Sequence, residues 1–492
     1  MILRISLSNR LEVISMNYRM IANIMGWILI FESLFMAVPL ITAVCCGEKE
    51  FWYFLITAAF CLLTGWLMIL KKPVHKELYS REGNVIAALS WILLSIFGAI
   101  PFYISGAIPS YLDALFETVS GFTTTGASIL SEVESMPRSI LMWRSFTHWV
   151  GGMGVLVFIM AFLPLSGAQN MYIMKAESPG PSVSKLVPRV KSTALLLYKI
   201  YFVLTLAEFV VLLICGMSVF DALNTAFATA GTGGFGVYND SMGSFSPAVQ
   251  IVVTVFMILF AINFNSYFFL ICGKIREAFN TEVCVFLAIV AAATGIITVN
   301  ISGLFATAGE ALRHSAFAVA SLISTTGFGT VDFNLWPELS RTVLVLVMFI
   351  GACAGSTGGG IKVSRILILC KSMHKELLAI VHPKQIKKIK LDSHPIEHEV
   401  VRGVNVFMVA YLMIFVISLV MISFDNHDLI TNFTAVAAAI NNIGPGLELV
   451  GPTSNFAFFS APAKVVLIFD MLAGRLELFP MLLLLTPSTW KS

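Results

Sequence analysis

The chain has 492 residues, of which 58% are hydrophobic and only 12% are charged, and its mean hydropathy is +0.88. Water-soluble domains carry about a quarter charged residues, so this composition excludes an ordinary soluble protein and predicts a chain that crosses a membrane many times. The net charge is only +3, and the eight cysteines are scattered without the spacing of a metal site. We expect neither a nucleic-acid partner nor a covalent cofactor.

The chain opens with residues 1–18, which have neither the clean apolar core nor the small-residue cleavage site of a signal peptide. About ten apolar runs follow, each near or above the roughly 20 residues that a helix needs to cross hydrocarbon. They lie at 21–46, 51–70, 85–105, 140–165, 194–220, 247–273, 283–303, 341–370, 402–423 and 463–486. The predicted fold class is an all-α membrane protein.

The loops between these runs predict one orientation. With a cytoplasmic N-terminus, the basic segments 71–84, 166–193 and 371–401 all face the cytoplasm, whereas the opposite loops carry acids such as Asp240 and Asp428. Basic residues favour cytoplasmic loops, so both termini are predicted to be cytoplasmic. The two long basic linkers, 166–193 and 371–401, could face anionic membrane lipid or bind a protein.

Four of the outward segments share a pattern, in which a helix-compatible stretch leads into residues rich in Gly, Thr or Asn. They read DALFETVSGFTTTGAS at 113–128, DALNTAFATAGTGGFG at 221–236, LRHSAFAVASLISTTGFG at 312–329 and LITNFTAVAAAINNIGPG at 429–446. The glycines that align, Gly126, Gly234, Gly327 and Gly444, recur about every 100 residues, which marks internal duplication. Helix packing by small residues could explain one such loop, but it does not explain four at corresponding positions.

The predicted architecture is four pseudo-repeats of helix, pore helix, filter and helix around a central pore, preceded by two transmembrane helices. The N-terminal two-helix extension is expected at 1–83. The repeats are expected at 84–193, 194–280, 281–399 and 400–492, the third of them including a gating loop and the basic cytoplasmic linker.

Non-helical backbone cannot lie bare in lipid, because each unpaired backbone group costs several kcal/mol there. Four such segments on one side of the membrane can be satisfied together if they converge on one axis and turn carbonyl oxygens inward. A ring of carbonyls can replace the hydration shell of an alkali cation, and threonine hydroxyls can add oxygens. We call residues 123–128, 231–236, 324–329 and 441–446 the filter segments; they contain no carboxylate, which argues for a monovalent rather than a divalent cation.

The apolar run 341–370 is interrupted at 351–360, where glycine is too dense for a stable helix. The sequence GSTGGGIK is not a phosphate loop, because Lys362 is followed by Val363 rather than by Ser or Thr. A glycine-rich break below a filter favours a flexible gate over a passive kink. The predicted gating residues are Gly355, Ser356, Thr357, Gly358, Gly359, Gly360, Lys362 and Arg475.

Two further charged positions lie within the apolar runs. Arg475 is in the last run, where a lone charge is costly unless it faces water or a partner. Below the filter its charge would oppose cation flow and help to set the gate, and the alternative is a structural ion pair. Arg144 and His148 lie one turn apart after the first filter segment, and for them local packing or pairing with an inward acid is the favoured interpretation.

These motifs resemble the Trk/Ktr/HKT superfamily of potassium transporters, and the Trk membrane subunit in particular. The resemblance covers nearly the whole chain. It rests on TTTGAS at 123–128, GTGGFG at 231–236, STTGFG at 324–329, NNIGPG at 441–446, GACAGSTGGGIKVSR at 351–365 and AGRLELFP at 473–480. The extra N-terminal helix pair is similar to the Trk branch.

The resemblance implies potassium uptake across a bacterial cytoplasmic (inner) membrane, with K+ as the transported ion. The implied ion-binding positions are Thr124, Thr125, Gly126, Thr232, Gly233, Gly234, Thr325, Thr326, Gly327, Asn442, Ile443 and Gly444. Glycine at all four aligned positions is the family pattern for potassium preference, whereas Asn442 and Ile443 depart from the threonine pattern, so strict fourfold symmetry is not expected. The resemblance also implies a homodimer in the membrane and a cytosolic nucleotide-binding (TrkA-like) regulatory ring.

The sequence argues against two other classes of membrane protein. A membrane enzyme would need a cluster of ionisable residues at a membrane face, whereas the runs contain only isolated charges such as Glu32 and Glu208. A monovalent-cation (Na+/K+) secondary transporter or symporter with inverted repeats would place its broken segments on opposite sides of the membrane. All four filter segments are predicted on the same side, which favours parallel repeats about one axis.

Overall fold

The computed structural model describes residues 16–70, 79–154, 190–383, 388–392 and 394–490. Helices dominate these residues, and their strands are limited to one short antiparallel pair, β1 (Lys390–Leu391) and β2 (His394–Pro395). This agrees with the all-α prediction. Several segments named in the sequence analysis lie partly outside the described residues. They are the N-terminal residues 1–18, the run 140–165 and the linkers 71–84, 166–193 and 371–401.

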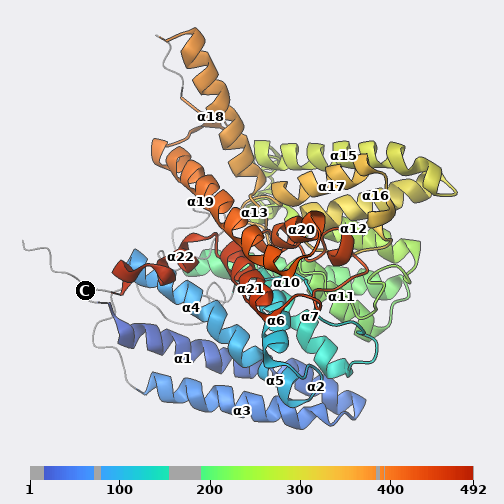
Figure 1. The fold of residues 1–492 in the computed structure, drawn as a ribbon, viewed down its shortest axis with the longest axis vertical. Coiled ribbons are helices and arrows are strands. Elements are labelled where there is room, and N and C mark those ends of the chain that lie inside the picture. The colour runs from blue at the N-terminus through green and yellow to red at the C-terminus, as the bar shows by residue number, and fades with distance from the viewer. Residues whose placement is uncertain (1–15, 71–78, 155–189, 384–387, 393, 491–492) are drawn as a thin grey trace, which may run out of the picture.

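The predicted N-terminal extension consists of α1 (Tyr18–Phe35), α2 (Ala37–Cys46) and α3 (Glu50–Ile69), and α1 and α3 lie side by side (Figure 1). Each helix presents a glycine at the crossing. A Cβ on Gly26 would lie 2.7 Å from the Gly65 carbonyl oxygen, and a Cβ on Gly65 would lie 2.6 Å from the Gly26 carbonyl oxygen. Glycine at both positions therefore lets the two backbones approach closely, as small residues do between membrane helices.

Four units of similar design follow, and each opens with a long helix. These helices are α4 with α5 (Ser80–Gly98 and Ile100–Ile104), α10 (Val190–Ile214), α15 (Thr281–Ile301) and α19 (His398–Ile422). The short α14 (Ile275–Ala278) leads into α15. The helices α4, α10 and α19 begin a few residues before the apolar runs, because the first turn of each is polar in sequence.

Each unit continues with a short helix that ends at a filter segment. These pore helices are α6 (Tyr111–Phe122), α11 (Val219–Gly231), α16 (Ala308–Ile323) and α20 (Leu429–Ile440). Every one begins at a side-chain cap, supplied by Ser110, Ser218, Thr307 and Asp428, which accepts a hydrogen bond from a first-turn N–H. Their lengths of 12, 13, 16 and 12 residues are less than the roughly 20 needed to cross a bilayer.

A helix follows each filter segment, and after the second, third and fourth segments it is broken in two. These helices are α7 (Arg138–Gly152), α12 with α13 (Pro247–Ala261 and Phe264–Ile271), α17 with α18 (Glu338–Ile350 and Val363–Val381) and α21 with α22 (Ala461–Arg475 and Phe479–Leu485). Figure 1 shows α18 extending beyond the rest of the molecule. Short 3-10 turns lie at Ser302–Leu304, Phe333–Leu335, Ser423–Asp425, Glu448–Val450 and Pro487–Thr489.

An interruption was expected at 351–360, and the structure has one at 351–362. The apolar runs 247–273 and 463–486, which were expected to be single helices, are each broken as well. The axes of α12 and α13 differ by 92°, because Ile262 is extended and the Asn263 side chain caps α13. After α21, Glu477 and Leu478 have φ of 56° and 69°, which ends the helix. By length and apolarity the described residues hold six possible membrane spans, or seven if the bent pair is one span.

The surface differs from that of a soluble protein. Large apolar side chains point outward along α3, α10 and α19, where Trp66, Phe202 and Val420 are 56%, 56% and 60% exposed. The polar side chains of the pore helices and filter segments are instead buried at the centre. Such an apolar exterior requires lipid as its solvent, so the chain is a multi-pass membrane protein.

Candidate functional site

The four filter segments share one backbone conformation. In each, the aligned glycine and the residue two positions before it have positive φ, a region that other residues seldom occupy. The earlier residues are Thr124, Thr232, Thr325 and Asn442, with φ of 56°, 55°, 61° and 54°. The glycines Gly126, Gly234, Gly327 and Gly444 have φ of 80°, 75°, 84° and 96°. The fourth segment therefore keeps the common backbone although its sequence departs from the threonine pattern.

The same hydrogen bond recurs between each filter segment and its own pore helix. The N–H of the residue before the aligned glycine donates to a carbonyl five positions back. The pairs are Thr125 to Ser120 (2.8 Å), Gly233 to Ala228 (2.9 Å), Thr326 to Ser321 (2.8 Å) and Ile443 to Ala438 (2.9 Å). A bond of this kind over a left-handed residue is a common helix ending, so each pore helix terminates in its filter segment by the same local chemistry.

The four filter segments meet in a closed ring. A Cβ on any of the four aligned glycines would lie under 3.0 Å from a main-chain carbonyl oxygen of another segment. The glycine-to-carbonyl pairs are Gly126 to Gly233, Gly234 to Thr326, Gly327 to Ile443 and Gly444 to Thr125. The contacts thus run from the first segment through the second, third and fourth and back to the first. Every carbonyl in the ring belongs to the residue just before an aligned glycine.

The ring lies between two hollows. A cavity of about 120 Å³ has all four aligned glycines in its wall, and none of its lining residues is an aspartate or a glutamate. A second cavity, of about 90 Å³, is lined by Asn442 of the fourth filter segment together with Lys362 and Arg475. The aligned glycines therefore border one cavity, and Asn442 borders the other together with most of the expected gating residues.

Most side-chain oxygens in the filter segments are bonded to protein. The hydroxyls of Thr125, Thr326, Thr232 and Thr325 bond to the Thr123 hydroxyl (2.8 Å), the Ser324 hydroxyl (2.7 Å), the Gly231 carbonyl (2.6 Å) and the Gly359 N–H (2.6 Å), respectively. Within the filter segments, the Thr124 hydroxyl and the Asn442 amide oxygen are buried without a hydrogen-bond partner. These two occupy equivalent positions in the first and fourth segments.

A glycine-rich loop, residues 351–362, connects α17 to α18 and packs directly against the third and fourth filter segments. Gly359 donates its N–H to the Thr325 hydroxyl (2.6 Å), and Gly360 donates to the Asn441 carbonyl (3.1 Å). A Cβ on Gly358 or on Gly359 would lie under 3.0 Å from the main chain of Ser324 or Asn441. Glycine is needed here because a side chain would separate the loop from the filter segments.

Two anchors hold the other side of this loop. At the bend between α12 and α13, Cys353 donates its N–H to the Ala261 carbonyl (3.0 Å), and Phe264 donates to the Gly355 carbonyl (3.0 Å). At the start of α15, one carboxylate oxygen of the buried Glu282 accepts the N–H groups of Ala354 (2.7 Å) and Ser364 (3.1 Å). Glu282 therefore holds both ends of the loop, although nothing near it in the sequence indicates this role.

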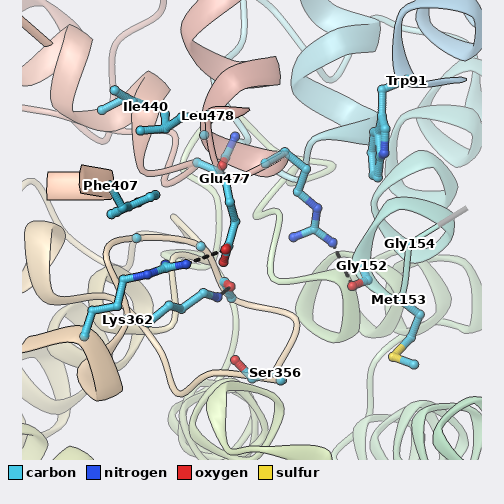
Figure 2. A pocket seen from close by; sticks show the side chains of 18 of the residues that line it. Trp91, Gly152, Met153, Gly154, Ser356, Lys362, Phe407, Ile440, Glu477 and Leu478 are labelled. Atoms are coloured by element: carbon cyan, nitrogen blue, oxygen red, sulfur yellow. Dashed lines mark hydrogen bonds and ion pairs between the residues drawn. The ribbon is translucent and has the colours of Figure 1, made fainter. Parts of the chain in front are cut away.

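Charged side chains from two repeats meet beside the loop (Figure 2). The Lys362 ammonium donates to the Gly358 carbonyl within the loop. Arg475 donates to the carbonyls of Thr357 (2.9 Å) and Gly152 (2.7 Å) and to that of Gly151. Arg475 thus joins the glycine-rich loop to the end of α7.

Glu477, which follows Arg475 by two residues, forms its ion pair with Arg365 of α18. Ser356, another expected gating residue, donates its hydroxyl to the Cys353 carbonyl (2.6 Å) within the loop, and the Thr357 hydroxyl donates to the Phe260 carbonyl (3.1 Å) of α12. The eight expected gating residues therefore do come together, with Arg475 bridging from another repeat.

Arg144 and His148 of α7 have different roles behind the first filter segment. Arg144 forms an ion pair with Glu117 (2.8 Å), and both side chains are almost fully buried. Glu117 also accepts the Ser128 hydroxyl (3.0 Å) and the Ile129 N–H (3.0 Å). The expected pairing with an inward acid is confirmed for Arg144. His148 instead bonds to two main-chain groups, the Gly121 carbonyl and the Phe235 N–H.

The described residues contain no group of three or more His, Cys, Asp or Glu side chains arranged to hold a metal ion. The oxygens gathered at the ring are instead main-chain carbonyls. Such oxygens suit a weakly held alkali cation that must enter and leave.

Comparison with known proteins gives consistent matches over nearly the whole chain. The TrkH family model, described as a cation transport protein, matches residues 52–491. The chain is 36% identical to the Trk system potassium uptake protein TrkH of Escherichia coli over 97% of this chain and 100% of that protein. It is 33% identical to the Trk system potassium uptake protein TrkG of Escherichia coli over 96% of this chain and 99% of that protein. The crystal structure of the potassium transporter TrkH from Vibrio parahaemolyticus superimposes with a TM-score of 0.87 at 34% identity, covering 97% of this chain and 100% of that one.

Proposed function

The chain belongs to the TrkH family of cation transport proteins, and on that premise we propose that it takes up potassium through the ring formed by its four filter segments. The observation that carries this proposal is the closed ring, in which each aligned glycine lies against a carbonyl oxygen of the next segment. Its relatives bear the name of potassium uptake proteins, which supports potassium as the ion.

The selectivity filter consists of the carbonyls of Thr125, Gly233, Thr326 and Ile443, with the aligned glycines leaving space between neighbouring segments. Four carbonyl oxygens around one axis replace part of the hydration shell of an alkali cation. The hydrogen bonds from these residues to their pore helices hold the carbonyls in place. A divalent cation would require carboxylate ligands, and the filter segments have none.

The pore helices add a favourable field. Each ends at its filter segment, so its C-terminal carbonyls, which carry a partial negative charge, lie near the ion path. The unpartnered Thr124 hydroxyl and Asn442 amide oxygen offer two further neutral oxygens in the filter segments. At the ring, a cation that has lost part of its water shell meets neutral oxygens only.

The glycine-rich loop is the gate. It contacts the third and fourth filter segments through Gly359 and Gly360, and the cavity beside it contains the cationic side chains of Lys362 and Arg475. Positive charge in a narrow, poorly solvated passage repels a cation. Opening therefore requires the loop to leave the filter segments and Arg475 to release the carbonyls of Thr357 and Gly152.

The setting of this pore is also part of the proposal. We place the chain in a bacterial cytoplasmic membrane with both termini in the cytoplasm, divided into the N-terminal extension and four repeats. It pairs with a second copy, lipid covers the exposed apolar faces, and a cytosolic nucleotide-binding ring acts on the basic linker after α18. The bias of basic residues toward the cytoplasmic loops supports this orientation.

Flux measurements on the purified full-length chain in liposomes test the function. Potassium should enter down its gradient, and sodium should compete only weakly. Flux with no preference for potassium over sodium would contradict the filter proposal. Uptake that stops when a proton or sodium gradient is removed, while the potassium gradient remains, would support a coupled transporter instead.

A further inference from the structure

His148 joins two filter segments that lie far apart in the sequence. Its side chain is fully buried in α7, between the first and second repeats. The Nδ1 atom is 2.7 Å from the carbonyl oxygen of Gly121, one residue before the end of the first pore helix. The Nε2 atom is 3.2 Å from the backbone nitrogen of Phe235, which directly follows the aligned Gly234.

The partners determine which nitrogen carries the hydrogen. A carbonyl oxygen only accepts and a backbone N–H only donates, so Nδ1–H donates to Gly121 and Nε2 accepts from Phe235. Both ring nitrogens are therefore used, and the ring brings no net charge to the filter. The Gly121 carbonyl also accepts the N–H of Thr124 (3.1 Å), so the histidine shares an acceptor with the first filter segment itself.

The ring also fills the space beside Gly233. A Cβ on Gly233 would lie under 3.0 Å from three atoms of the His148 ring. Gly233 does not have the positive φ of its neighbour Gly234, so its backbone does not require glycine. The imidazole therefore explains why the second segment has glycine at the place where the first and third have Thr125 and Thr326.

The contact reaches the ion path through one carbonyl. Gly233 supplies the ring carbonyl that faces Gly126 of the first segment. His148 packs behind Gly233, and it hydrogen-bonds the residue on the far side of Gly234. The position of this carbonyl relative to the first segment is therefore set by the imidazole. At the junction of the fourth and first segments, the Asn442 amide instead donates to the Thr125 hydroxyl (2.9 Å).

We infer that His148 is a positioning residue for ion selectivity, which fixes the Gly233 carbonyl against the first filter segment and thereby contributes to the preference for potassium over sodium. This inference rests on the proposed function of the ring. A side chain that supplies one donor and one acceptor in the same space should preserve selectivity. A side chain that only fills the space should weaken it, because the Phe235 N–H then loses its acceptor.

The test compares His148→Leu and His148→Gln in the full-length chain, reconstituted in liposomes. Leucine fills space without hydrogen bonds, whereas glutamine retains a donor and an acceptor. Trp149→Phe is the matched control, because the neighbouring Trp149 donates to Thr205 of α10 rather than to a filter segment. The readout is the sodium concentration divided by the potassium concentration at which the two competing ions occupy the pore equally. This ratio does not depend on the amount of protein in the liposomes.

The ratio should fall about tenfold in His148→Leu, which corresponds to about 1.4 kcal/mol at 25 °C, and should stay within about twofold of wild type in His148→Gln and Trp149→Phe. An unchanged ratio in His148→Leu would overturn the inference, and so would an equal fall in all three variants. If the wild type itself shows no potassium preference, it is the proposed function that fails. If the wild type prefers potassium but His148→Leu ranks ions normally, only the inference fails.

A second measurement covers the case in which His148→Leu does not fold. Gly233→Ala adds a methyl group that would meet the imidazole, so it should also lower the ratio. In combination with His148→Gln, whose flexible side chain can yield to that methyl group, the loss should be smaller than in Gly233→Ala alone. If the fold-changes of the two single substitutions simply multiply in the double variant, the two residues act independently, and this result would contradict the inference.

Discussion

Replacement of Gly126 by serine tests the geometry of the ring. A Cβ at this position would lie under 3.0 Å from the Gly233 carbonyl oxygen, whereas non-bonded heavy atoms prefer about 3.5 Å. The first and second filter segments must therefore separate by at least about 0.5 Å. Serine also has to adopt a φ of 80°, which costs about 1–2 kcal/mol for a residue with a side chain.

The displaced atom is one of the four ring carbonyl oxygens. The substitution should therefore alter the binding of the ion and not only the stability of the fold. A loss of about 1–3 kcal/mol in the differential binding of potassium corresponds to a roughly 5- to 150-fold fall in the potassium-to-sodium ratio. The assay is potassium uptake into proteoliposomes with sodium as competitor, scored as the ratio of the two apparent affinities.

Gly106→Ser is the matched control for backbone strain. Gly106 lies in the connection between α5 and α6 with a φ of 75°, close to that of Gly126, but a Cβ there would have nothing within 4 Å. Gly106→Ser should therefore cost similar backbone energy and leave the ion ranking unchanged. An unchanged ranking in Gly126→Ser, or an equal loss in both variants, would refute the role of the aligned glycine.

Three further outcomes are expected. Deletion of residues 358–360 removes the contacts with the third and fourth filter segments, so unstimulated potassium flux should rise while the ion ranking stays the same; an altered ranking would mean that the filter lies elsewhere. Glu282→Ala leaves two N–H groups of the gate without an acceptor, at about 1–3 kcal/mol each, and should raise unstimulated flux at least about fivefold, with Glu282→Gln intermediate; equal flux in all three proteins would show that Glu282 does not hold the gate. Arg144→Met buries the Glu117 carboxylate without its partner and should destabilise the fold by about 3–5 kcal/mol, seen as a lower thermal midpoint in detergent, whereas the double variant with Glu117→Gln should recover part of the loss; a midpoint equal to that of wild type would argue against a buried ion pair.

The parts of this architecture that depend on local sequence could be predicted. The apolar runs indicated the membrane class, and the recurrence of one glycine in four outward segments indicated the ring. Those glycines lie where φ is positive and where two backbones approach closely. Because both conditions favour glycine at one particular position, they are visible in the sequence. The density of glycine at 351–360 marked the loop in the same way.

Features that depend on long-range partners could not be predicted. Glu282 bonds to N–H groups that lie 72 and 82 residues further along the chain, so nothing near it in the sequence indicated its role. The breaks after Ala261 and Arg475 lie within apolar runs. At the first break, the backbone carbonyls of Phe260 and Ala261 accept N–H groups of the glycine-rich loop in another repeat. At the second, the N–H groups of Leu476 and Leu478 bond back to carbonyls of α21. Gly233 did leave a signal, since a glycine in place of threonine indicates a space filled from elsewhere, but the sequence could not say that His148 fills it.

Anomalous diffraction from crystals soaked in rubidium, an ion close to potassium in size, tests the ring most directly. A peak is expected on the axis among the carbonyl oxygens of Thr125, Gly233, Thr326 and Ile443, and it should weaken in Gly126→Ser. A peak only in the cavity beside the glycine-rich loop, with none among the four carbonyls, would contradict the assignment of the filter.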